Sequence, residues 1–170
     1  MFITVTGGSG SGKSAFAEQE IIKFPEGKRV YIATMMCFDE ESRKRVQRHR
    51  LMRRDKKFET LECYTDLAHA RIPEGSVVLL ECMSNLTANE LFAPEGAKEA
   101  AEEALQKGIL HLKERAAHVC VVTNEIFSDG MDYDPETEHY MEILGHINEF
   151  LAEISDVCYE VIYGIPIRIK

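Results

Sequence analysis

The sequence predicts one α/β domain, residues 1–170, in which helices cover both faces of a mostly parallel β-sheet, so that the fold has three layers. Two observations lead to this class. Short apolar runs rich in Val and Ile alternate with segments of helical spacing along the chain. In addition, a glycine-rich turn joins the first run, Phe2–Thr6, to a helical segment. This order is typical of the start of a strand–helix–strand unit. We find no internal repeat, low-complexity tract or linker that would divide the chain.

The expected strands are short apolar runs, most of them bounded by polar or turn residues. In chain order they are Phe2–Thr6, Arg29–Thr34, Phe58–Tyr64, Ser76–Cys82, His118–Thr123, Val157–Tyr163 and Ile165–Ile169. The fourth contains a continuous apolar run, which is typical of a strand buried on both faces. The last two are joined by a very short turn at Gly164, so we expect them to pair antiparallel at one edge of the sheet.

The expected helices fill the gaps between these strands. Apolar residues at helical spacing favour a helix at Ser14–Lys23, which the sequence Pro25-Glu26-Gly27 ends. Asp39 can cap a second helix that runs to about Arg54. The others are expected at Asn85–Phe92, at Glu95–Ala117, which is rich in Ala, Glu and Leu, and at Pro135–Ile154.

Composition indicates an ordinary globular protein. Apolar residues make up 45% of the chain and charged residues 29%, and no apolar stretch is long enough to span a bilayer. The N-terminus lacks a basic region and a cleavage site, so we expect no signal peptide and a cytoplasmic location. The five cysteines form no C-x-x-C pair, and four stand in or beside strand-like runs, as buried thiols in a reducing compartment would: Cys63, Cys82, Cys120 and Cys158.

Positive charge is concentrated in one segment. Residues 43–57 hold nine of the twenty Lys and Arg and a single acid, Asp55, so the segment carries +8. Because the whole chain carries −9, the remainder carries −17. A protein this acidic repels long polyanions, and we expect no nucleic-acid partner. The basic segment suits a small, dense anion such as a nucleoside triphosphate, although a solvated helix face has the same composition.

The glycine-rich turn matches the phosphate-binding pattern G-x-x-x-x-G-K-[ST] with the residues Gly7, Gly8, Ser9, Gly10, Ser11, Gly12, Lys13 and Ser14. Glycines let backbone N–H groups turn toward phosphate oxygens, and the following helix N-terminus adds partial positive charge. Lys13 is expected to reach the β- and γ-phosphates, and the Ser14 hydroxyl to hold Mg²⁺. A strand before the turn and a helix after it favour this interpretation over a chance glycine-rich turn with a lysine.

One acid is placed to complete the magnesium site. Enzymes with this loop usually carry an acid at the end of a neighbouring strand. Glu81 ends the apolar run Val77–Leu80 and fits that role. The alternative is a strand-end acid that faces solvent, but a Glu next to a continuous apolar run is costly without a partner.

The basic segment also contains a candidate nucleophile. Arg45, His49 and Arg53 follow one another at i, i+4 spacing, which lines them along one helix face. Flanking arginines repel the protonated imidazole, so the pKa of His49 should be depressed and the ring largely neutral at pH 7, as a nitrogen nucleophile requires. Spacing alone leaves open the alternative of an exposed histidine on a basic helix.

Several segments together resemble the bifunctional adenosylcobinamide kinase / adenosylcobinamide-phosphate guanylyltransferase family of cobalamin synthesis. The resemblance runs nearly end to end, and its most specific part is the pattern R-V-x-x-H-x-x-x-R of residues 45–53, which follows Tyr31-Ile32-Ala33-Thr34. Further matching segments are Ile3–Gly8, Gly12-Lys13-Ser14, Glu62-Cys63, Leu79–Cys82, Asn89-x-Leu91-Phe92, Val122–Glu125, Gly145-x-x-Asn148 and Gly164–Lys170.

This resemblance implies a concrete function. The family phosphorylates the aminopropanol hydroxyl of adenosylcobinamide with ATP or GTP, and then transfers GMP from GTP to that phosphate through a GMP-histidine, here His49. It implies a P-loop, RecA-like fold, a homotrimer and a corrinoid substrate, with no membrane insertion. Positions that match nucleotide contacts in the family are Gly7–Ser14, Ala33, Thr34, Met35, Arg50, Leu51, Met52, Arg53, Glu62 and Glu81.

The sequence departs from the family pattern in one region. Where relatives usually read G-x-G-I-V-P, this chain reads Phe127-Ser128-Asp129-Gly130-Met131-Asp132, and Glu138 and Met141 stand where relatives tend to have arginines. Two alternatives therefore stay open beside the family's reactions. One is a diverged kinase or nucleotidyltransferase that acts on another small acceptor. The other is a nucleotide-binding switch whose basic helix docks an anionic partner.

Overall fold

The computed structural model describes all residues except 26, 37–39 and 41–55. The described strands form a seven-stranded sheet in the order β3-β2-β4-β5-β1-β6-β7. All neighbouring pairs are parallel except β6 and β7, which form an antiparallel edge. The strand bounds are β1 Phe2–Thr6, β2 Arg29–Ala33, β3 Phe58–Glu62, β4 Val77–Glu81, β5 His118–Val122, β6 Val157–Ile162 and β7 Ile165–Arg168.

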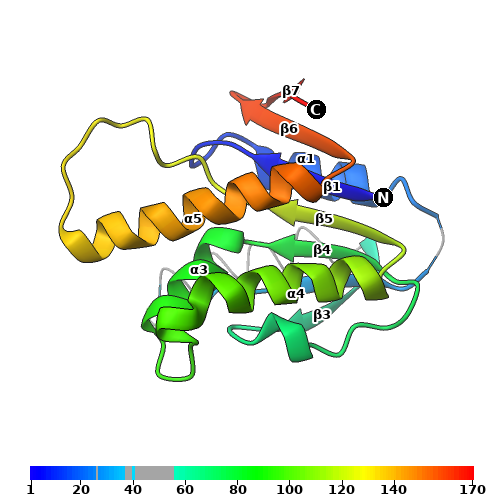
Figure 1. The fold of residues 1–170 in the computed structure, drawn as a ribbon. Helices are drawn as coiled ribbons and strands as arrows, with labels where there is room; N and C mark the ends of the chain where they lie inside the picture. Colours follow the sequence, from blue (N-terminus) through cyan, green and yellow to red (C-terminus); the bar gives the residue numbers. More distant parts are fainter. Residues whose placement is uncertain (26, 37–39, 41–55) are drawn as a thin grey trace.

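Helices lie on both faces of this sheet (Figure 1). The α-helices with described bounds are α1 Lys13–Ile21, α3 Met83–Phe92, α4 Ala101–Arg115 and α5 Pro135–Ile154, and the 3₁₀ turns are η2 Leu67–His69 and η3 Lys98–Ala100. Figure 1 shows α3, α4 and α5 in front of the sheet and α1 behind it. The predicted three-layer α/β fold with an antiparallel edge pair is confirmed.

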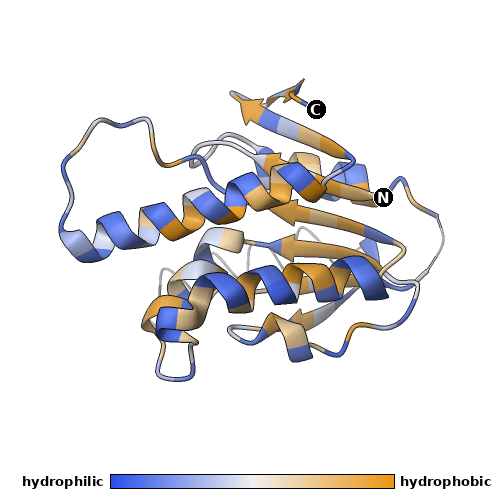
Figure 2. Ribbon diagram, in the orientation of Figure 1, coloured by the Kyte–Doolittle hydropathy of each residue, from blue (hydrophilic) through white to orange (hydrophobic). Residues whose placement is uncertain are grey.

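Two buried clusters follow from the alternation of side chains along the strands. Phe2, Val78 and Val121 pack with residues of α3, α4 and α5 on one face. Their neighbours Ile3 and Val77 pack with Ala17 and Ile21 of α1 on the other. Figure 2 shows the same division, because the central strands are mostly hydrophobic while α4 and α5 alternate between hydrophobic and hydrophilic residues.

One predicted helix is wrong in its first part. The helix expected at Glu95–Ala117 begins as α4 at Ala101, after the short turn η3. The reason is a tight turn around Gly96, where an added Cβ would stand 2.4 Å from the backbone oxygens of Asn89 and Glu90. The other predicted bounds in the described residues agree to within about two residues, the usual uncertainty of element ends. The helix expected at 39–54 lies outside the described residues.

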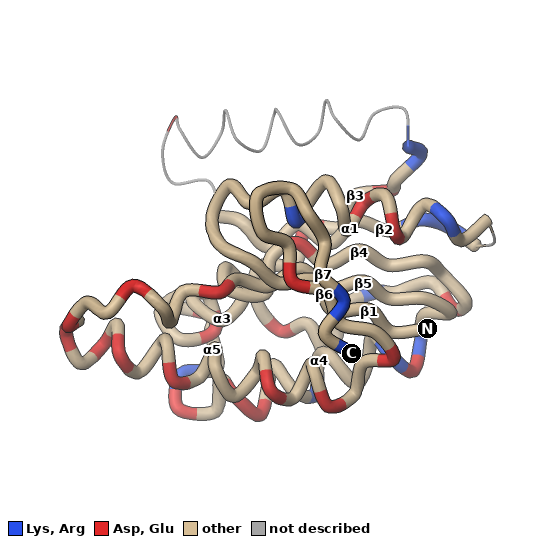
Figure 3. Tube along the Cα trace, turned by 90° about the horizontal axis from the view of Figure 1, so that it is seen from above, with Lys and Arg blue, Asp and Glu red and all other residues tan. Residues whose placement is uncertain are grey.

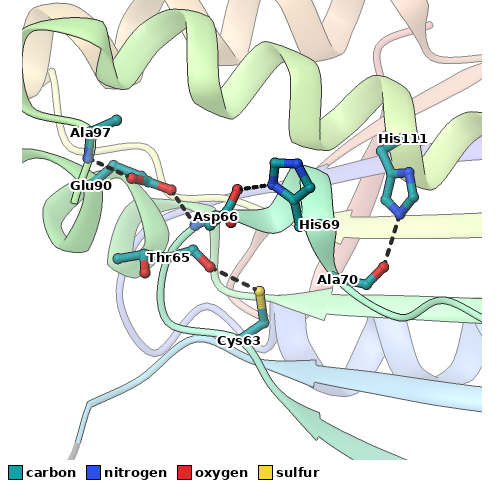
Figure 4. A network of polar contacts seen from close by, with 8 residues as sticks. All are labelled: Cys63, Thr65, Asp66, His69, Ala70, Glu90, Ala97 and His111. Carbon is teal, nitrogen blue, oxygen red and sulfur yellow. Dashed lines mark hydrogen bonds and ion pairs between the residues drawn. The ribbon is translucent and has the colours of Figure 1, made fainter. Parts of the chain in front are cut away.

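A buried carboxylate fixes the loops on either side of α3 (Figure 4). Glu90 is 2% exposed and accepts hydrogen bonds from the Asp66 amide, 2.7 Å, and the Ala97 amide, 2.9 Å. The chain after β3 is held further by Cys63, whose thiol donates to the Thr65 carbonyl, and by His111 of α4, whose Nε2 lies 2.9 Å from the Ala70 carbonyl. Sequence patterns do not predict this network, because the partners of Glu90, Cys63 and His111 are backbone groups of loops.

Candidate active site

The glycine loop joins β1 to α1 at the carboxyl edge of the parallel strands. Gly7, Gly10 and Gly12 have positive φ angles of 147°, 71° and 91°, which side chains with a Cβ rarely adopt. Gly7 also needs the space, because a Cβ there would stand 2.5 Å from the Val161 carbonyl oxygen. Gly12 is the N-cap of α1, and none of the described side chains caps the first turn. The amides at this helix start are therefore available to an anion.

Lys13 lies within this loop rather than in solvent. Its side chain is buried, and Nζ donates to the Gly8 carbonyl at 2.9 Å. Burial lowers the pKa of Lys13, and the nearby Cys82 and Glu81 partly oppose the shift. The ammonium is thus held at the cradle in a partly desolvated position, where an anionic ligand would interact with it more strongly than in water.

The loop contains one buried polar atom that lacks a protein partner. Ser11 Oγ is buried and makes no hydrogen bond within the part of the chain that the structure describes. The Ser9 and Gly10 positions are exposed, while Ser14, in the first turn of α1, is half-buried. A hydroxyl buried in a loop of this geometry is the kind of group that a bound phosphate oxygen would satisfy.

Three of the predicted nucleotide residues lie in one row across the sheet. Glu62 of β3 is opposite Ala33 of β2, and Ala33 is opposite Glu81 of β4. The row continues through Val122 of β5 to Val5 of β1, two residues before the glycine loop. The parallel register therefore brings these positions to the same edge as the loop (Figure 1), although they are far apart in the sequence.

Glu81 is half-buried and already partnered. Its Oε2 accepts a hydrogen bond of 2.8 Å from the hydroxyl of Tyr31 on the neighbouring strand β2. The carboxylate is near enough to Lys13 to oppose the lowering of that lysine's pKa. The structure thus places the predicted magnesium acid beside the loop lysine and not on a solvent face, and Tyr31 is a partner that the sequence did not suggest.

The other predicted contacts at the end of β2 differ in accessibility. Thr34 is fully buried, and its hydroxyl both donates to the Cys82 carbonyl, 2.9 Å, and accepts from the Cys82 amide, 2.7 Å. Ala33 and Met35 are half-buried, and Glu62 is exposed. Thr34 therefore joins β2 to the end of β4, and its hydroxyl is fully engaged in that contact.

A polar cluster that sequence reasoning missed lies at the ends of β4 and β5. Asn124 Nδ2 donates to Ser84 Oγ at 2.5 Å, and the Cys82 thiol is 2.7 Å from the same hydroxyl. Asn148 of α5 donates to the Asn124 carbonyl at 3.2 Å. Cys82, expected to be buried, is half-buried here, whereas Cys63, Cys120 and Cys158 are buried free thiols. The available signal was that polar residues directly follow two apolar strands.

A second missed residue holds the chain on both sides of the basic segment. Asn89 of α3 donates to the carbonyls of Thr34 and Tyr64, each at 2.8 Å. Near the end of the basic segment, Lys56 forms an ion pair with the buried Glu18 of α1, and Arg29 donates to the Lys56 carbonyl. The chain leaves and re-enters the sheet at fixed points beside the nucleotide loop.

The remaining predicted residues lie outside the described part of the chain. They are the proposed nucleophile and the four positions after it, His49, Arg50, Leu51, Met52 and Arg53. Among the described residues, no three His, Cys, Asp or Glu gather as a metal site would.

Phosphate binding is the chemistry that this edge of the sheet can supply. The uncapped start of α1, the glycine backbone and the half-desolvated Lys13 all direct positive charge to one point. The acidic residues visible along α4 and α5 lie away from that point (Figure 3). Fold and loop together define the class of the P-loop nucleotide-binding enzymes.

Within this class, the chain belongs to the cobinamide kinase / cobinamide phosphate guanyltransferase family, whose model matches residues 3–169. It is therefore a bifunctional enzyme. The chain is 35% identical to the bifunctional adenosylcobalamin biosynthesis protein CobU of Escherichia coli (strain K12), over 100% of both chains. It is 34% identical to the protein of the same name from Salmonella typhimurium, again over 100% of both chains.

A solved structure with a similar arrangement is the flagellar accessory protein FlaH from Methanocaldococcus jannaschii. The match covers 94% of this chain and 70% of that one, with 10% sequence identity and a TM-score of 0.45. A similarity of this extent contributes nothing to the functional assignment. None of the helices in the described ranges has the length and apolarity needed to cross a membrane.

Proposed function

We propose that the protein phosphorylates adenosylcobinamide with ATP or GTP and then transfers GMP from GTP to the product, giving adenosylcobinamide-GDP. The observation that carries this proposal is the glycine loop in which Lys13 is held on the Gly8 carbonyl beside Glu81, within a chain that matches the family over residues 3–169. The family and the relatives support the two activities, and the loop supports nucleotide binding.

In the kinase step, the protein's contribution is positioning and charge. The amides of Gly7–Ser14 would bind the phosphates, and Lys13 Nζ would leave the Gly8 carbonyl for a phosphate oxygen. The substrate hydroxyl attacks the γ-phosphorus, the bond to the β-phosphate oxygen breaks, and the hydroxyl proton is released. The negative ligand favours the protonated lysine, which opposes the effect of burial on its pKa.

Mg²⁺ fits the oxygen groups available here. Ser14, in the first turn of α1, and Glu81, at the end of β4, are the residues that would hold it, directly or through water. When bound, the ion would neutralise charge on the phosphates. Tyr31 would orient the Glu81 carboxylate through the hydrogen bond of 2.8 Å.

The guanylyl step uses a covalent intermediate. A ring nitrogen of His49 attacks the α-phosphorus of GTP, a P–N bond forms, and pyrophosphate leaves. An oxygen of adenosylcobinamide phosphate then attacks the same phosphorus and releases His49. Two displacements divide a difficult transfer between two anions into easier steps. Support for His49 comes from the pattern of residues 45–53 and its i, i+4 arginines.

The test is to incubate the protein with GTP labelled at the α-phosphate. Label should remain on the chain as a phosphoramidate, labile in acid and stable in base. His49→Ala should lose the label and guanylyl transfer but still phosphorylate adenosylcobinamide, because γ-transfer needs no nitrogen nucleophile. An adduct that persists in His49→Ala, or that base removes, would contradict the assignment.

Self-association is a separate part of the proposal. The family resemblance implies a homotrimer, and the edge strand β7 with the residue after it carries exposed apolar side chains that a subunit contact would cover: Ile165 at 65%, Ile167 at 45% and Ile169 at 60% exposure. Light scattering coupled to gel filtration should give about three times the mass of one chain. A monomer mass across the working concentration range would remove this part of the proposal.

A further inference from the structure

The β6–β7 hairpin packs directly against the glycine loop. The Gly164 amide, in the turn of the hairpin, donates to the Ser11 carbonyl at 2.8 Å. The backbones approach so closely that a Cβ on Gly12 would lie 3.4 Å from the Gly164 Cα. In Figure 1 the hairpin turn and the loop lie at the same end of the sheet. Whatever stands at the tip of this hairpin is therefore next to the phosphate cradle.

The residue at the hairpin tip, Tyr163, is unusual in its exposure and in its backbone conformation. Tyr163 is 95% exposed, and within the residues that the structure describes its ring contacts no other ring. The pair Ile162 and Ile165 closes a two-residue turn whose central residues both have positive φ, 50° at Tyr163 and 78° at Gly164. Such turns favour Asn or Gly at the first position. Neither turn geometry nor burial therefore explains an aromatic residue here.

Other aromatic residues at this end of the molecule are already engaged. The Tyr31 hydroxyl bonds to Glu81, and Phe16 and Tyr159 contact each other edge-to-face with centroids 4.9 Å apart. Tyr163 is the aromatic side chain in the described part of the chain that is both adjacent to the loop and almost wholly exposed. A nucleotide with its phosphates in the loop presents a flat, apolar base within reach of the loop's surroundings.

We infer that Tyr163 stacks on the purine base of the nucleotide whose phosphates the glycine loop binds. The inference deepens the proposed function and rests on it. Every nucleobase has a π-face, and stacking of that face on an aromatic ring contributes substantially to affinity. The hydrogen bond from Gly164 to Ser11 would keep the ring at a fixed position relative to the phosphates. This arrangement accepts adenine and guanine alike, as an enzyme that uses ATP or GTP requires.

The test compares two ligands and three variants. Tyr163→Asn removes the ring while keeping a residue that tolerates positive φ, and Tyr163→Phe keeps the ring without its hydroxyl. Leu110→Gln removes an exposed apolar side chain from α4, which packs on the face of the sheet opposite α1, and is the control. Dissociation constants are measured for GTP and for inorganic tripolyphosphate, which has the charge but no base.

Tyr163→Asn should raise the Kd for GTP about tenfold and leave the Kd for tripolyphosphate unchanged, whereas Tyr163→Phe and Leu110→Gln should bind both like the wild type. Because the chain contains no Trp, Tyr163→Trp supplies a single reporter. Its fluorescence should be quenched when GTP binds, but not when tripolyphosphate binds.

Three outcomes separate the possible failures. If the wild type binds neither ligand, the proposed function fails. If the wild type binds GTP and Tyr163→Asn binds it equally well, only the stacking inference is overturned. If Tyr163→Asn changes the mass of the oligomer and leaves GTP affinity unchanged, the ring contacts a second copy of the chain, and the inference is again overturned.

Discussion

Two segments at the carboxyl edge of the sheet are held in place in different ways. The glycine loop is fixed by distant parts of the chain, since the Gly7 carbonyl accepts from the Glu125 amide and the Ser11 carbonyl from the Gly164 amide. Beyond Asn124 and Glu125, the segment 127–134 is held mainly by local hydrogen bonds. Glu125 accepts from Phe127 and Ser128, and Asp129 from Met131 and Tyr133. Tertiary contacts therefore hold the glycine loop in place, whereas local contacts hold the segment before α5.

The difference matters because the locally held segment is also the one that departs from the family pattern. Phe127, Met131 and Tyr133 are exposed there, at 42%, 66% and 39%. Local hydrogen bonds constrain few positions elsewhere, so this segment can change its sequence without disturbing the loop. The contrast indicates that the glycine loop is the more constrained of the two segments and that residues 127–134 are the less constrained.

The largest effect is expected for a substitution in the glycine loop. Lys13→Met should reduce kinase activity about 100-fold or more and remove most triphosphate affinity, because a charge directed at the phosphates is lost. The fold should persist, since the lysine's hydrogen bond is to a loop carbonyl. Turnover with saturating adenosylcobinamide, alongside circular dichroism, measures both. Undiminished turnover would show that the working site lies elsewhere.

A matched pair of glycine substitutions compares the two segments directly. Gly7→Ala should lower the free energy of unfolding by about 2–3 kcal/mol, because its Cβ would stand 2.5 Å from a backbone oxygen of Val161. Gly130→Ala should cost only about 1 kcal/mol, since the positive φ is strained but nothing lies within 4 Å. Urea unfolding of both variants measures the difference. Equal costs would mean that the two segments are equally constrained.

A smaller effect is expected on the acceptor side. Glu138 is exposed in the first turn of α5, where relatives tend to have arginine. Glu138→Arg should lower the KM for adenosylcobinamide phosphate about threefold to tenfold, because a charge-assisted contact replaces repulsion at a solvent-screened position. The KM for adenosylcobinamide, which lacks the phosphate, should barely change. If both constants stay the same, this helix face does not line the corrinoid site.

The smallest effect concerns pH. Burial lowers the pKa of Lys13 below 10.5, so between the two values the unfolded chain binds more protons than the folded one. The stability of the ligand-free protein should therefore rise with pH across that window. Lys13→Met should lack this contribution, so the stability of the wild type relative to Lys13→Met should rise as the pH increases. Urea unfolding at several alkaline pH values measures it, and a difference independent of pH would refute it.

The sequence predicts those features of the fold that depend on local residue patterns. Alternating apolar runs predicted the strands, and the short turn at Gly164 predicted the antiparallel edge, which the structure confirms. The predicted start of α5 at Pro135 is confirmed, and Asp134 caps the helix there. The loop Gly7–Ser14 was recognisable because its glycines are required at fixed positions.

Features that depend on distant contacts were out of reach. Nothing in the sequence near Tyr31 indicates that its hydroxyl bonds to Glu81, fifty residues away, or that Asn89 joins the carbonyls of Thr34 and Tyr64. The turn before α4 was missed for the same reason, because a buried Glu90 holds Ala97 there. The roles of His49 and Arg50–Arg53 remain predictions, since these residues lie outside the described part of the chain.

The position of β5 sets the distance between the two strands that lead to Lys13 and Glu81. Because β5 lies between β1 and β4, the strand that leads to Lys13 and the strand that ends at Glu81 are two interstrand spacings apart, about 9.5 Å. That separation is determined by backbone hydrogen bonds and not by side-chain size. Substitutions of the side chains along these strands can therefore accumulate without changing the distance between the two strand ends.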